Sequence, residues 1–118
     1  MTIHDEELMQ ILLQTFHEEA AEHLQTLNQN LLKLERQPDE AQKTALLQDA
    51  FRTAHSLQGA ARAVDLKEIE QLAHHIEDIL KMARDENQQL TPAICDTIYN
   101  TLDGIQAVLN NETPDVAK

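Results

Sequence analysis

Apolar residues recur every three or four positions along most of this chain, which is the spacing of one face of an α-helix. Four segments carry the pattern, and the helices that they predict span residues 3–36, 42–63, 66–87 and 91–110. Pro38 ends the first segment, because proline disfavours helical geometry in the residue before it. Thr91 and Pro92 are typical of a helix start, with threonine as the cap and proline at the first helical position. Asp65 is predicted to cap the third helix.

Short links between these segments indicate antiparallel neighbours, so the expected fold class is all-α, an up-down antiparallel four-helix bundle. The first segment is longer than the others, and one of its ends should overhang the bundle or pack alone. Its apolar stripe comprises Leu8, Ile11, Leu12, Phe16, Ala20, Leu24, Leu27, Leu31 and Leu34. We assign residues 1–110 to the bundle. Residues 111–118 contain Pro114 and no apolar period, so we expect a linker or a cut end there.

Composition favours a single helical domain. The chain has 118 residues with 2 glycines, 3 prolines and 3% aromatic residues, too few turn and strand formers for a β-rich fold. The formal net charge of −12 makes nucleic acid and anionic membranes unsuitable partners, since both attract basic surfaces. A protein partner with a basic or apolar docking face is favoured instead.

The single cysteine, Cys95, excludes an internal disulfide and fits a reducing cytoplasm. It lies on the inward side of the fourth helix, so we interpret it as a core residue rather than a nucleophile. The chain has no apolar run long enough to span a bilayer and no signal-peptide core. It also has no glycine-rich phosphate loop, so we expect no cofactor in this chain and no bound ATP.

The most distinctive stretch runs from Phe51 to Arg62, where Gly59 follows His55 by four residues inside a predicted helix. Residues four apart share one face of a helix, and a helical glycine costs about 1 kcal/mol relative to alanine. Such a glycine is tolerated where another molecule must approach the backbone. The sequence therefore indicates a macromolecule that docks over the His55 imidazole.

A helical wheel places His55 and Arg62 on the shoulder of the second helix's apolar stripe, with Gly59 and Arg52 farther toward solvent. Glu77 lies on the corresponding shoulder of the third helix, so His55 and Glu77 can meet. A carboxylate that accepts one ring proton fixes the tautomer and leaves the other nitrogen free to take a phosphoryl group. An ordinary surface histidine in a solvated ion pair is the alternative that these two residues alone leave open.

The 6 histidines and 21 acidic residues also raise the question of a metal site. Di-iron helical bundles use Glu-x-x-His, a spacing of three, on two of their helices. Here Glu19 precedes His23, and Glu70 precedes His74, by four residues. His74 and His75 are adjacent, so they point to different sides of a helix. No metal site is therefore predicted.

The chain resembles the histidine phosphotransfer (HPt) domain family, and within it the N-terminal phosphotransfer domain of chemotaxis-type (CheA-like) histidine kinases. The resemblance covers most of the chain and is densest in the runs 16–24, 31–35, 50–64 and 70–80. It implies that His55 accepts a phosphoryl group from a kinase catalytic domain that holds Mg-ATP. It further implies that His55 donates the group to an aspartate of a response-regulator receiver domain, in a cytoplasmic phosphorelay. We expect the isolated domain to be monomeric.

Matched by position, Glu77 would orient His55, and His74 would be a second neighbour of its ring. The residues expected to contact a docked partner are Gly59, Arg52 and Ser56. The start at Met1 and the linker-like tail fit the N-terminal domain of a longer kinase. Any kinase activity would need a further domain, because the chain has no ATP motif of its own.

Two positions depart from the family pattern. The family usually has a lysine, which helps to stabilise phosphoryl charge, where this chain has Gln58. Arg62 is the first candidate to compensate for that lysine. The family also usually has glycine where this chain has Asp65. These departures keep a second function open, a helical adaptor that binds a regulator or kinase with weakened or no phosphotransfer.

Overall fold

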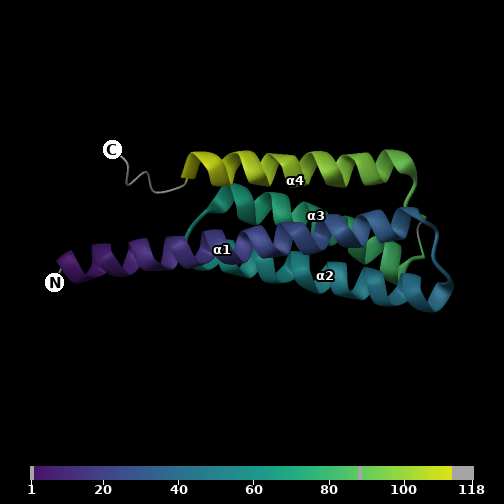
Figure 1. Ribbon diagram of the computed structural model, residues 1–118, viewed down its shortest axis with the longest axis horizontal. Helices are drawn as coiled ribbons and strands as arrows, with labels where there is room; N and C mark the ends of the chain where they lie inside the picture. Colours follow the sequence, from purple (N-terminus) through teal and green to yellow (C-terminus); the bar gives the residue numbers. More distant parts are fainter. Residues whose placement is uncertain (1, 88, 113–118) are drawn as a thin grey trace.

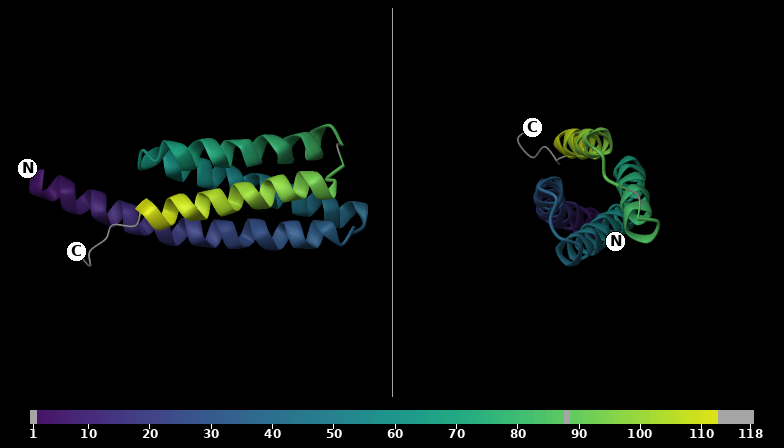
Figure 2. Two further views of the ribbon diagram at one scale, coloured as in Figure 1. Left: turned by 90° about the horizontal axis from the view of Figure 1, so that it is seen from above. Right: turned by 90° about the vertical axis from the view of Figure 1, so that its right-hand side faces the viewer.

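The computed structural model describes residues 2–87 and 89–112, and these residues form four α-helices with no strand among them. The helices are α1 (Thr2–Glu35), α2 (Glu40–Ala63), α3 (Lys67–Asp85) and α4 (Pro92–Glu112). Successive helices run antiparallel, each packs against the next, and α4 closes the bundle against α1 (Figures 1 and 2). The predicted all-α up-down bundle is confirmed.

Side chains cap two of the helices at their first turns. The Asp39 carboxylate accepts from the Gln42 backbone N–H at 2.8 Å and begins α2. The Thr91 hydroxyl accepts from the Ile94 N–H at 3.2 Å, as the sequence predicted for α4. Helix α4 continues to Glu112, two residues beyond its predicted end. The rest of the predicted tail, residues 113–118, lies outside the described residues.

The prediction that Asp65 caps α3 is wrong. The residue before α3 is Leu66, which makes no side-chain cap, whereas Asp65 has a left-handed backbone with φ 61°. The Asp65 N–H donates to the Arg62 carbonyl, and the Leu66 N–H donates to the Ala61 carbonyl. This is the Schellman motif, which ends a helix with one left-handed residue and most often uses glycine there. Asp65 therefore terminates α2, with a backbone conformation that glycine adopts without strain, as would the glycine that the family resemblance leads us to expect here.

The core is built from one apolar stripe on each helix. Side chains with no exposed surface include Leu27, Leu57, Ile69, Ile76, Leu80, Ile98 and Ile105, and Cys95 is 2% exposed, which confirms its predicted place in the core. Helix α4 is also joined to α1 at the surface, where the Tyr99 hydroxyl donates to Glu35 Oε1 at 2.7 Å. None of the helices in the described residues is long and apolar enough to cross a membrane.

The amino-terminal part of α1 overhangs the bundle, as its length predicted. Helix α1 has 34 residues and α2 has 24, a difference of about 15 Å at 1.5 Å per residue. Figures 1 and 2 show this end of α1 extending beyond the other helices. Leu8, Ile11 and Leu12 are 55%, 60% and 42% exposed, so these members of the predicted stripe lie outside the core. From Phe16 onward the stripe is buried.

Candidate functional site

The predicted contact between the second and third helices is present. His55 projects from α2 with 69% of its side chain exposed, and its Nδ1 lies 2.6 Å from Glu77 Oε2 on α3. Glu77 is only 13% exposed, because it lies on the edge of α3 that faces α2. The carboxylate is therefore fixed in the seam between two helices, while the imidazole it holds remains open to solvent.

This geometry fixes the roles of the two ring nitrogens of His55. An ionised carboxylate only accepts hydrogen bonds, so Nδ1 must carry the proton and donate it to Glu77. In the neutral ring Nε2 then holds the lone pair, and the ring that carries it is largely exposed. This arrangement can serve a nucleophile of defined tautomer, because a positive charge that forms on the ring would face a carboxylate.

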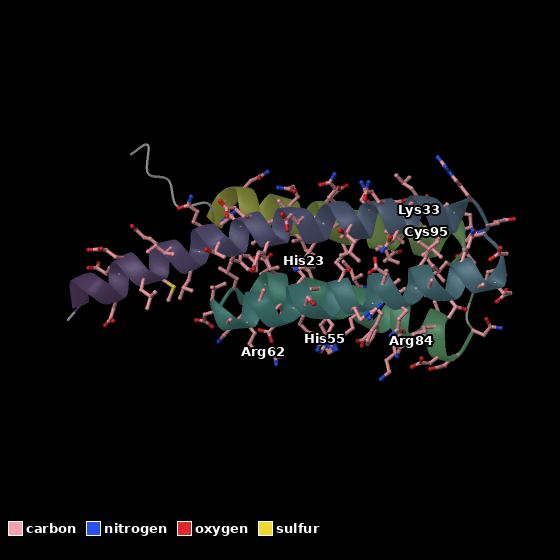
Figure 3. The ribbon with its side chains drawn as sticks, turned by 60° about the horizontal axis from the view of Figure 1, so that its bottom comes forward. His23, Lys33, His55, Arg62, Arg84 and Cys95 are labelled. Carbon is pink, nitrogen blue, oxygen red and sulfur yellow. The ribbon has the colours of Figure 1, made fainter. Side chains whose placement is uncertain are left out.

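Two more pairs of side chains join α2 to α3 along the seam, one on each side of the pair formed by His55 and Glu77. Arg62 Nε donates to Glu70 Oε2 at 2.7 Å, and Arg84 Nη1 donates to Gln48 Oε1 at 3.3 Å. The two residues of each pair lie equally far along the chain from Leu66, and so do His55 and Glu77. Figure 3 shows His55, Arg62 and Arg84 along one edge of the molecule, on the side of α2 and α3. The short turn therefore sets which α3 residue faces His55.

Gln58, Arg62 and His74 line one shallow hollow of this seam, together with Lys67 on α3. Gln58 is 8% exposed, whereas the Arg62 side chain is 67% exposed and paired with Glu70. His74 Nε2 lies 3.3 Å from Asp78 Oδ1, one turn farther along its own helix. Glu77 is thus the residue that holds the His55 ring, and the orienting role expected of His74 stays a prediction.

The surface around His55 on α2 is open. Arg52, Ser56 and Gly59 are all exposed, and a Cβ added at Gly59 would meet nothing within 4 Å. Open space one turn from the imidazole agrees with the inference that this glycine keeps the helix surface bare. The contacts of these three residues with a docked partner remain predictions.

Asp65 is an acidic residue where the family usually has glycine, and its charge would repel a phosphoryl group if the two lay close together, but it lies far from the imidazole. It follows His55 by ten residues, a rise of about 15 Å along a helix. At this separation two charges in water interact by about 0.3 kcal/mol before salt screening. An aspartate in place of glycine at this position therefore affects how α2 ends, and its charge has little effect on a phosphoryl group at His55.

The sequence analysis missed one ring beside His55 and the cation that contacts that ring. The Phe51 ring, one turn earlier on α2, lies nearly parallel to the imidazole, with ring centroids 6.4 Å apart and planes at 13°. The Arg84 guanidinium lies 4.1 Å from the centroid of the Phe51 ring. The four-residue spacing from Phe51 to His55 was a signal in the sequence, but Phe51 was named there only as the start of the distinctive stretch.

Other reactive groups of the described residues are placed differently. Burial raises the pKa of the Cys95 thiol, with smaller contributions from Glu35 and Asp96. Such a thiol is a poor nucleophile. Within residues 2–87 and 89–112, no group of three or more His, Cys, Asp or Glu side chains is arranged to hold a metal ion. The candidate chemistry therefore centres on His55.

Fold and site together define a class of protein: a helical bundle that exposes one oriented imidazole at the seam between two of its helices. The chain belongs to the Hpt domain family, whose model matches residues 11–110. It is 37% identical over 98 residues to the chemotaxis protein CheA of Halobacterium salinarum, and 32% identical over 100 residues to that of Listeria monocytogenes. These matches cover 83% and 85% of this chain but only 14% and 16% of the relatives.

Solved structures show the same fold. The CheA phosphotransferase domain from Thermotoga maritima is 32% identical and superposes with a TM-score of 0.79, covering 86% of this chain and 94% of that domain. The phosphorylated P1 domain of CheA3 from R. sphaeroides, in complex with CheY6, has a TM-score of 0.78 over 88% of this chain and 79% of its own. At 24% identity the second match shows the fold alone.

Proposed function

We propose that this chain is the phosphotransfer module of a chemotaxis-type histidine kinase, with His55 as the phosphoryl carrier. The observation that carries the proposal is the 2.6 Å contact from Nδ1 to Glu77, combined with an imidazole that is 69% exposed. The proposal is supported by CheA relatives and by a phosphotransferase domain with the same fold. We place the module in the cytoplasm, where ATP is available and a free cysteine stays reduced.

Two displacements at phosphorus make up the proposed relay. In the first, the Nε2 lone pair attacks the γ-phosphorus of Mg-ATP held by a kinase domain, the N–P bond forms, and the P–O bond to ADP breaks. In the second, an aspartate carboxylate of a receiver domain attacks the same phosphorus, and the N–P bond breaks. Nδ1 keeps its proton throughout, and Glu77 stabilises the positive ring when Nε2 is phosphorylated.

The first test is isotopic labelling of the full chain. The chain is incubated with labelled ATP and the catalytic domains of a CheA relative from which the phosphotransfer domain has been removed. We expect a label that is labile in acid, stable in base and absent in His55→Gln. His75→Gln is the matched control, because His75 is also exposed but lies on α3 away from the seam, and it should be labelled like the wild type.

A second candidate function is an adaptor that binds a regulator without phosphotransfer. Gln58 favours it, because the position that usually carries a lysine holds a neutral side chain that is 8% exposed. Binding of a receiver domain to a chain that neither ATP with kinase nor a small phosphoryl donor can label would establish the adaptor. Transfer of label from His55 to the receiver would exclude it.

A further inference from the structure

The His55 imidazole is held at two places, and only one of them is a hydrogen bond. Glu77 contacts its edge at Nδ1. The Phe51 ring lies nearly parallel to the imidazole, with the two ring planes at 13° and their centroids 6.4 Å apart. That separation falls within the range at which offset aromatic rings attract each other. Phe51 also packs against the hydrophobic core, so it ties the exposed imidazole to the rigid part of the bundle.

The Phe51 ring is itself held by a fixed cation. The guanidinium carbon of Arg84 lies 4.1 Å from the ring centroid, a distance typical of a cation–π contact. Arg84 in turn donates to both oxygens of Asp85, at 2.6 Å and 3.1 Å, and to Gln48 at 3.3 Å. Its side chain is 23% exposed, low for an arginine at a surface seam. The chain of contacts therefore runs from Asp85 through Arg84 and Phe51 to His55.

One hydrogen bond leaves an imidazole free to rotate about the line from Nδ1 to its acceptor. Such rotation changes the direction of the Nε2 lone pair, which must point along the line of attack at phosphorus. A ring packed parallel to the imidazole restricts that rotation. The bond to Glu77 and the Phe51 ring together define both the position and the plane of the nucleophile.

We propose that Phe51 and Arg84 are positioning residues for phosphoryl transfer: Phe51 fixes the plane of the His55 ring, and Arg84 fixes Phe51. The inference rests on the proposed function, because it assigns these residues a role at the same histidine. An aromatic pair of this kind corresponds to about a two- to tenfold change in rate. This is the expected size of the loss when Phe51 becomes leucine.

The orientation of the His55 ring is measured first, on the full chain and without any phosphoryl donor. In nuclear magnetic resonance spectra, Phe51→Leu should shift the carbon-bound ring protons of His55, because the ring current of Phe51 is lost. The ¹⁵N shifts should still report a proton on Nδ1, because Glu77 is unchanged. Arg84→Gln, which removes the guanidinium from the Phe51 ring, should move the same ring protons in the same direction by a smaller amount. Unchanged ring-proton shifts in both variants would overturn the proposal.

The rate is measured next, with potassium phosphoramidate as the donor, so that no kinase is needed. Nε2 attacks phosphorus, the N–P bond to the leaving group breaks, and ammonia is released. Phosphorylation should slow about two- to tenfold in Phe51→Leu and less in Arg84→Gln. Phe51→Tyr keeps an aromatic ring and should retain the wild-type rate. Equal rates for leucine and tyrosine at this position would show that only bulk is needed and would refute the proposal.

Phe16→Leu is the matched control for lost core packing. Phe16 is 2% exposed on α1 and makes no ring contact with His55. The variant should melt at a lower temperature yet react with phosphoramidate at the wild-type rate while folded. A chain that phosphoramidate labels but a kinase does not would contradict the proposed function and leave the positioning role intact. If phosphoramidate fails to label even the wild type, the ring-proton shifts alone decide.

Discussion

Replacement of Gly59 should separate the stability of the bundle from its ability to bind a receiver domain. A Cβ at this position meets nothing within 4 Å, and the backbone has an ordinary helical conformation, so no strain opposes a side chain. Gly59→Ala should therefore stabilise the fold by up to about 1 kcal/mol, the intrinsic helical cost of glycine. For a domain of this size, that corresponds to a rise in melting temperature of about 4 °C.

Gly59→Glu should raise or maintain the melting temperature while blocking the partner. The new side chain begins one turn from His55, a rise of about 6 Å, where the receiver's aspartate must approach the phosphoryl group. Its charge also meets the acidic phosphoryl site of the receiver. We expect at least about a tenfold loss of affinity, or 1.4 kcal/mol. Melting is followed by circular dichroism, and affinity by titration calorimetry with a receiver domain that takes label from the wild type.

Ala45→Glu is the control for added charge on the same helix. Ala45 is exposed on α2 and precedes His55 by ten residues, about 15 Å along the axis, so this variant should bind like the wild type. The reasoning fails if Gly59→Glu binds and accepts transfer normally, because the partner would then not dock over this face. It fails equally if Gly59→Ala lowers the melting temperature, because the open space described at Gly59 would then be absent.

Four further changes test the rest of the site and the fold. Glu77→Ala should slow phosphorylation of His55 by about tenfold, less than the roughly 10²–10⁴-fold that acid–base groups supply, with little change in melting temperature. Gln58→Lys restores the usual family residue and should speed transfer to a receiver in a quench-flow assay. Burial and the hydrogen bond to Glu35 on α1 raise the pKa of Tyr99 above its usual value near 10. The unfolded chain therefore loses the tyrosine proton first, and the free energy of unfolding of the wild type should fall relative to Tyr99→Phe above pH 10, by up to about 1.4 kcal/mol per pH unit. Asp65→Gly relieves a left-handed residue and should stabilise the fold by up to about 1 kcal/mol in urea unfolding.

Each of these expectations has a contrary result. Unchanged labelling in Glu77→Ala would move the orienting role to His74, and an unchanged rate in Gln58→Lys would leave Arg62 as the group to test. If the free energies of unfolding of Tyr99→Phe and the wild type change in parallel between pH 9 and 12, the tyrosine titrates alike in the folded and the unfolded chain. A destabilised Asp65→Gly variant would mean that the aspartate side chain, and not only its backbone, stabilises the end of α2.

The spacing of apolar residues predicted much of this structure, because residues three and four apart along the chain lie on one face of a helix. It placed Glu77 beside His55, since both lie on matching shoulders of two antiparallel stripes. It could not give the backbone of Asp65, because a left-handed residue is imposed by the turn that joins two packed helices. The contact of Arg84 with Phe51 could not be predicted from the sequence either, because it depends on the register between α2 and α3. The length of the first segment predicted that one end of α1 would overhang, but periodicity put Leu8, Ile11 and Leu12 in the apolar stripe without showing that they lie in the overhanging end.

The single exposed nitrogen of His55 has a kinetic consequence for the proposed relay. Glu77 occupies Nδ1, so the donor that loads the histidine and the acceptor that unloads it must both reach Nε2. Because two protein domains cannot occupy that space together, each turnover requires the kinase to leave before the receiver arrives. A large excess of receiver should then inhibit loading while it speeds unloading, which gives an optimum receiver concentration. The flux through the module would thus depend on how fast its two partners exchange.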